Sequence, residues 1–145
     1  MLTSSNLLPV TKIALLLAVL FLTLPSSAQD IKILNRSNPG EHFEVKQYLS
    51  RDKLNVVVFH SSHSPACQKL REPLEGLARR RRDLAISLVD VDRRGSQEID
   101  WKSPLVRQYN LRLVPYVYII DAEGNSVAEG HEARKKILEW TELGF

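Results

Sequence analysis

The strongest constraint on the fold is an apolar run that leads into the start of a helix. Residues 54–59 read Leu-Asn-Val-Val-Val-Phe, which is β-branched and apolar on both faces. Runs of this kind are typical of a central strand that helices cover on both sides. Ser64 and Pro65 follow shortly afterwards, and these residue types are favoured at the N-cap and at the first position of a helix. The chain is therefore expected to alternate strands with helices.

The segments that follow repeat this alternation. A helix is expected over residues 65–82, with Pro73 inside it as the source of a kink. The apolar run at 85–91 predicts the next strand, and a helix of this length between two strands makes them a parallel, right-handed pair. Ser103 and Pro104 repeat the capping pair, so a short helix should begin there and end near Asn110.

Shorter elements complete the pattern. The sequence predicts strands at 31–34, 116–121 and 126–128, a turn at 122–125, a short helix around 43–49 and a final helix over 132–143. The final helix should present Ala133, Ile137, Leu138 and either Trp140 or Thr141 to the sheet. Together these elements predict a single α/β domain.

Residues 1–28 have the features of an export signal. Lys12 is the only charged residue among them, residues 13–24 are an almost continuous apolar run, and small residues stand at 26–28. Twelve helical residues would span about 18 Å, which is well short of a bilayer core of about 30 Å. We therefore expect a signal peptide at 1–28, a domain at 29–145, and an exported protein that is periplasmic or extracytoplasmic. Membrane attachment is expected only if the signal stays uncleaved.

Charge and cysteine content narrow the classes of partner. The chain has 20 Lys and Arg residues against 17 Asp and Glu residues, a near balance that gives no support for nucleic-acid binding. Cys67 is the only cysteine, so the chain cannot form an internal disulfide. Its thiol is therefore either buried or available to a partner. A monomer without a cofactor is expected.

Several segments, in this order and spacing, resemble the thioredoxin superfamily. They are the strand at 56–59, the helix start with Cys67 in its first turn, the sequence Tyr-Asn-Leu-Arg-Leu-Val-Pro at 109–115, the hairpin at 121–125 and Gly130 before the last helix. Residues 99–104, leading into 108–109, are similar to a subgroup of exported bacterial thioredoxin-like proteins. The resemblance covers roughly residues 43–140. It implies a thioredoxin-like domain with a central mixed β-sheet, and a role in thiol-disulfide exchange on exported proteins.

The resemblance also implies a site. The attacking cysteine of the family corresponds to Ser64 and the resolving cysteine to Cys67, and these two are the candidate catalytic residues. A cis peptide at Val114-Pro115 would face the helix start and help to bind extended peptides; His63, Pro65, Val114 and Pro115 are the candidate substrate-binding residues. Val58 stands where thioredoxins carry a buried acid. A serine and a cysteine cannot close a disulfide, so dithiol cycling is excluded. The chain is expected to be an accessory protein that binds peptide thiols or disulfides of exported proteins.

Two alternatives remain open on the sequence. Cys67 could act as a monothiol oxidoreductase that forms mixed disulfides with glutathione or a protein, because burial raises a thiol pKa while a helix N-terminus lowers it. Alternatively, His60, His63 and Cys67 have the chemistry of copper or zinc ligands. A serine nucleophile at Ser64 would need His63 as a base and an orienting acid, so the N-cap role is favoured for that residue.

Overall fold

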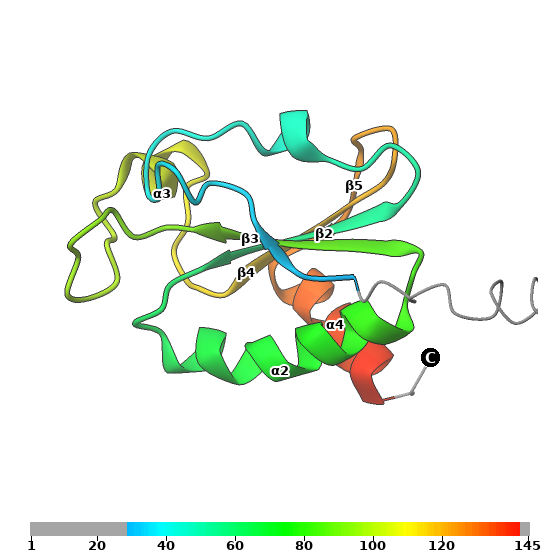
Figure 1. Ribbon diagram of the computed structural model, residues 1–145. Helices are drawn as coiled ribbons and strands as arrows, with labels where there is room; N and C mark the ends of the chain where they lie inside the picture. Colours follow the sequence, from blue (N-terminus) through cyan, green and yellow to red (C-terminus); the bar gives the residue numbers. More distant parts are fainter. Residues whose placement is uncertain (1–28, 143–145) are drawn as a thin grey trace, which may run out of the picture.

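A five-stranded mixed sheet organises the described part of the chain, residues 29–142 of the computed structural model (Figure 1). The strands are β1 (Lys32–Ile33), β2 (Leu54–His60), β3 (Leu84–Asp90), β4 (Tyr116–Ile120) and β5 (Ser126–Glu129). The helices are a 3-10 turn, η2 (Val45–Tyr48), and α2 (Pro65–Arg80), α3 (Pro104–Gln108) and α4 (Gly130–Glu142). The strand order is β1-β3-β2-β4-β5. The expected order of elements is confirmed.

The pairing of the strands confirms the parallel unit and the hairpin. β3 pairs in parallel with β1 and with β2, whereas β4 is antiparallel to both β2 and β5. In this register His60 lies opposite Asp90, and Phe59 lies opposite Tyr116. The carboxyl ends of β2 and β3 therefore meet at one edge of the sheet, directly before α2 begins.

β2 is covered on both faces, as its composition predicts. Val56 and Val58 pack into the core under α2 and α4, whereas Val57 and Phe59 pack into a second core together with residues of η2 and α3. Figure 1 shows α2 and α4 together on one side of the sheet and η2 and α3 on the other. Each fully buried side chain of this size stabilises the fold by about 1.5–3 kcal/mol. β2 has more buried residues than the other strands and therefore contributes the most apolar burial.

Both Ser-Pro pairs cap helices as expected. The Ser64 side chain accepts a hydrogen bond from the Cys67 amide at the start of α2, and the Ser103 side chain accepts one from the Val106 amide at the start of α3. A proline follows each cap at the first helical position. α2 includes Pro73 and ends at Arg80, two residues earlier than expected.

The last helix differs from the prediction in two respects. α4 begins at Gly130, immediately after β5, rather than at Glu132. Leu138 is also 42% exposed instead of facing the sheet. Ala133 and Ile137 are fully buried, and Trp140 packs against the same core. Positions 133, 137 and 140 share one helical face, whereas position 138 lies about 100° further around the helix.

The N-terminal part of the described chain differs slightly from the prediction. The expected strand at 31–34 is shorter, because only Lys32–Ile33 pair with β3. Within residues 29–142 no helix is long and apolar enough to cross a bilayer. The predicted signal at 1–28 lies outside the described residues.

Candidate functional site

The start of α2 is joined to the loop before β4 by one serine. Ser64 is only 3% exposed. Its hydroxyl oxygen accepts a hydrogen bond from the Cys67 amide at 3.3 Å, and the hydroxyl donates to the Val114 carbonyl oxygen at 3.4 Å. The Val114-Pro115 peptide is cis, as the resemblance implied. The structure therefore brings Ser64, Cys67 and the Val114-Pro115 peptide together at one site.

The only thiol of the chain is held below the surface of this site. Cys67 is 8% exposed. Burial raises the pKa of Cys67, and this effect outweighs the opposing effects of the Ser64 hydroxyl, the Ser61 backbone and the positive charge of Arg134. Burial is thus the largest influence on the pKa of this thiol. The Cys67 side chain is therefore a protonated thiol near neutral pH.

A largely apolar cavity of about 260 Å³ lies on the sheet side of Cys67. Val58 lines it and is fully buried, so a valine provides apolar surface where the resemblance implies an acid. The cavity is also lined by His60, whose Nε2 is the one buried side-chain nitrogen or oxygen without a hydrogen-bond partner in residues 29–142. Burial lowers the pKa of His60, against the influence of Asp90. A neutral imidazole therefore shares this cavity with a neutral thiol.

A hydrogen-bond network next to the helix start was not predicted from the sequence. Asp92 is 6% exposed, and its carboxylate accepts hydrogen bonds from the Ser61 hydroxyl at 2.6 Å and from the Asp100 amide at 2.9 Å. The Ser61 hydroxyl oxygen in turn accepts a hydrogen bond from the His63 amide at 3.0 Å. Asp92 thus links the turn before α2 to the loop at 93–102.

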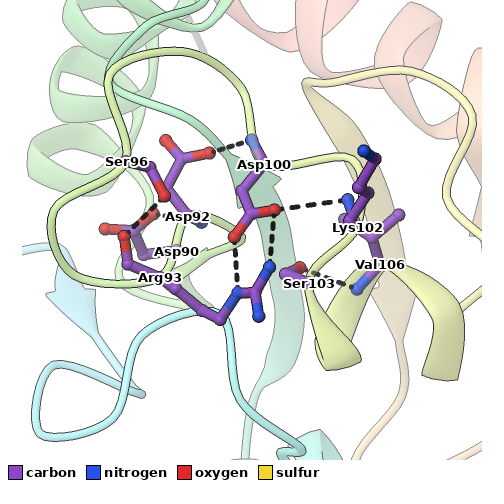
Figure 2. Close-up of polar contacts among 8 residues, drawn as sticks. All are labelled: Asp90, Asp92, Arg93, Ser96, Asp100, Lys102, Ser103 and Val106. Carbon is purple, nitrogen blue, oxygen red and sulfur yellow. Dashed lines mark hydrogen bonds and ion pairs between the residues drawn. The ribbon is translucent and has the colours of Figure 1, made fainter.

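Figure 2 shows how this loop is closed on itself. Arg93 forms two hydrogen bonds with the Asp100 carboxylate, at 2.7 and 3.1 Å, and the Ser96 hydroxyl donates to the Arg93 carbonyl oxygen at 2.7 Å. The only hint in the sequence was the Asp-x-Asp at 90–92, which stands where β3 ends. Its partner Asp100 lies beyond a polar loop, so no short-range pattern connects the two.

The predicted metal alternative is wrong for the described residues. His63 is exposed, and its Nε2 lies 3.0 Å from the Ser96 carbonyl oxygen of the loop. His60 instead lies beside Asp90 at the end of β2. In residues 29–142 no three His, Cys, Asp or Glu side chains gather closely enough to hold a metal ion. The spacing of His60, His63 and Cys67 in the sequence therefore does not become a coordination geometry.

The other candidate residues lie around the helix start. Pro65 is exposed, whereas Pro115 is buried and directly follows the Val114 carbonyl that accepts the Ser64 hydrogen bond. His63 is directed at the loop at 93–102 rather than at Ser64 or Cys67. It is therefore not placed to act as a base on the Ser64 hydroxyl, which already donates to Val114.

Comparison with known proteins gives a consistent result. A family model described as a thioredoxin-like domain matches residues 44–143. No curated protein matches the chain. Among solved structures, thioredoxin from Trichomonas vaginalis is 17% identical, with a TM-score of 0.57 over 81% of this chain and 99% of that chain. The short form of spinach chloroplast thioredoxin f is 18% identical, with a TM-score of 0.53 over 81% and 94%. Thioredoxin from Trypanosoma brucei brucei is 15% identical, with a TM-score of 0.52 over 83% and 96%.

Proposed function

The chain belongs to the thioredoxin-like domain family. We propose that it is an exported accessory protein, which binds cysteine-containing peptide segments without dithiol redox cycling. Its partners would be thiols or disulfides of other exported proteins in the periplasm or an equivalent compartment. Export rests on the signal-like residues 1–28, which make up the part of the chain before the domain at 29–145.

The observation that carries this proposal is the position of Ser64. A dithiol exchange site releases its mixed disulfide by attack of a second thiol from the same chain. Here the residue at the other end of the x-x-C spacing is a serine, and its hydroxyl is engaged by the Cys67 amide and the Val114 carbonyl. The cis peptide at Val114-Pro115 is present, but the second sulfur is missing.

The chemistry that remains at the site suits binding more than turnover. Cys67 is buried with a raised pKa, so little thiolate is present near neutral pH to attack a disulfide. The exposed residues around the site, Pro65, Arg112 and Leu113, offer backbone and side-chain surface to an extended peptide. We therefore assign recognition to the helix start and to the loop before β4.

Two measurements on residues 29–145 test this proposal. Insulin reduction in the presence of dithiothreitol should stay at the background rate, because Cys67 has no second thiol to release a mixed disulfide. Nuclear magnetic resonance titration with an extended cysteine-containing peptide should shift the amide signals of Ser64, Cys67 and Leu113. Catalytic insulin reduction, or shifts confined to other surfaces, would disprove the accessory role.

A monothiol oxidoreductase is the second candidate, because Cys67, although buried, lines the cavity of about 260 Å³. In that reaction the Cys67 thiolate attacks glutathione disulfide, a Cys67-glutathione disulfide forms, and one glutathione thiolate leaves. Mass spectrometry after incubation with glutathione disulfide tests it. A stoichiometric adduct within minutes at pH 7, removed by added glutathione, would favour the enzyme over the accessory protein.

A further inference from the structure

A second hollow, of about 530 Å³, lies between α2 and α4 at the end of α2 that carries Ser64. Pro65, Pro73 and Leu138 contribute apolar surface to it. Leu138 is 42% exposed, so this large apolar side chain faces the hollow instead of the core. Figure 1 shows both helices on one face of the sheet, and the two helices contact each other. Because Ser64 also lines the hollow, the hollow adjoins the candidate site.

The charges on this hollow are all of one sign. Lys69 on α2 and Arg134 on α4 line it, both side chains are exposed, and no Asp or Glu lines it. Neither Lys69 nor Arg134 takes part in the ion pairs Arg71-Glu75, Arg81-Asp83 and Arg93-Asp100 found within residues 29–142. The positive charge of Arg134 also acts on Cys67, which places it in electrostatic reach of the candidate site.

We propose that the hollow between α2 and α4 binds a partner segment in which an apolar side chain stands next to a carboxylate. The apolar side chain would pack on Pro65, Pro73 and Leu138, and the carboxylate would pair with Lys69 and Arg134. This inference rests on the proposed function, because it names the class of peptide that the accessory site receives. Lys69 and Arg134 beside an apolar surface fit such a peptide better than a nucleic acid, because nucleic-acid binding requires a longer row of phosphate contacts.

Peptide binding tests the inference. The probes are two fluorescein-labelled decapeptides with the same central Leu-Cys-Leu, one flanked by Asp and Glu and the other by Lys and Arg. The acidic peptide should bind residues 29–145 about three- to tenfold more tightly, as expected for two exposed ion pairs. Its affinity should fall as NaCl is raised from about 20 to about 300 mM, because the screening length between charges then shortens by about a factor of four.

Charge reversal assigns the effect to the hollow. The double variant Lys69→Glu with Arg134→Glu should remove or invert the preference for the acidic peptide. The matched control is Lys135→Glu with Lys136→Glu, which makes the same change in net charge at two exposed positions of α4 that do not line the hollow. The control should keep the preference for the acidic peptide. Leu138→Ser should weaken binding of that peptide without changing the fold measured by circular dichroism.

The outcomes separate this inference from the proposed function. Equal affinity for the two peptides would overturn the inference alone, since the protein would still bind extended peptides. The inference would also be overturned if the Lys135→Glu, Lys136→Glu control lost the preference for the acidic peptide as strongly as the Lys69→Glu, Arg134→Glu variant. If neither peptide binds at millimolar concentration, both the inference and the proposed function are overturned.

Discussion

The Ser64 hydroxyl donates a hydrogen bond to the carbonyl oxygen of Val114 at 3.4 Å, across 50 residues of sequence. The same hydroxyl oxygen caps α2 through the Cys67 amide. One side chain therefore connects the beginning of the helix to the loop that carries the cis peptide. Because this side chain is a serine, the connection is a hydrogen bond and the neighbouring thiol has no sulfur partner.

The first prediction concerns the reactivity of Cys67. Because burial raises its pKa above the ordinary value of 9.0, iodoacetamide should label Cys67 more slowly at pH 7 in the native protein than in urea. Ser64→Ala should cost about 0.5–2 kcal/mol through loss of the cap, and it should slow labelling further because the hydroxyl that lowers the thiol pKa is removed. Ser103→Ala is the matched control, since it removes an equivalent cap from α3 and should leave Cys67 labelling unchanged. Native labelling as fast as that of the unfolded chain would contradict the prediction.

The second prediction is that Ser64→Cys creates a redox-active pair. The substitution exchanges one small cap residue for another, at a cost of about 0.5–2 kcal/mol, so the fold should be retained. On oxidation with diamide the two cysteines should form an intramolecular disulfide, seen as a loss of two titratable thiols without a change in oligomeric state. Insulin reduction should then rise above background, with lower activity than a full thioredoxin because Val58 provides no buried acid. A folded variant that never closes this disulfide would show that the helix start does not have the family geometry.

The third prediction concerns the pH dependence of stability. Burial lowers the pKa of His60 below its ordinary value of 6.5, so the unfolded chain binds this proton more readily than the folded protein. The stability contributed by a neutral His60 is therefore fully present above pH 6.5 and is lost as the pH falls towards the lowered pKa. The pKa of Asp90 is raised by burial, which opposes this trend at lower pH.

His60→Phe isolates the histidine contribution. The free energy of unfolding in urea should fall between pH 7.5 and pH 5.5 in the wild type and fall less in the variant. At pH 7.5 the variant should be no less stable, because an unpartnered buried polar atom costs about 1–3 kcal/mol and Phe removes it. His131→Ala, at an exposed position of α4, should retain the wild-type pH dependence. An identical pH profile for the wild type and His60→Phe would exclude His60 as its source.

The fourth prediction concerns the carboxylate that anchors the loop at 93–102. Asp92→Asn keeps the size of the side chain but replaces one of its two acceptor oxygens with a donor. Either the Ser61 hydroxyl or the Asp100 amide then loses its acceptor. The free energy of unfolding should fall by about 1–3 kcal/mol, and hydrogen exchange should become faster at the Asp100 amide. Asp52→Asn, at an exposed carboxylate outside this loop, should leave hydrogen exchange at the Asp100 amide unchanged. Unchanged exchange at Asp100 would show that Asp92 does not hold the loop.

Much of the fold could be predicted because its signals are local. The β-branched run of β2 and the Ser-Pro pairs at 64–65 and 103–104 act through propensity and capping within a few residues. The order of strands and helices follows from these signals, as does the parallel pairing of β2 with β3. The missing second sulfur is also a property of the sequence alone, since Cys67 is the only cysteine.

The properties of the site depend on contacts between residues that are distant in sequence. The sequence places Cys67 in the first turn of a helix, but only its burial under the packed chain makes desolvation the largest influence on its pKa. Likewise, Asp92 and Asp100 meet because a loop folds back on the end of β3, and His63 turns to that loop. The exposure of Leu138 depends on which face of α4 meets the sheet. Desolvation and long-range hydrogen bonds are set by the environment that the whole chain creates around a group, so they emerge only in the folded molecule.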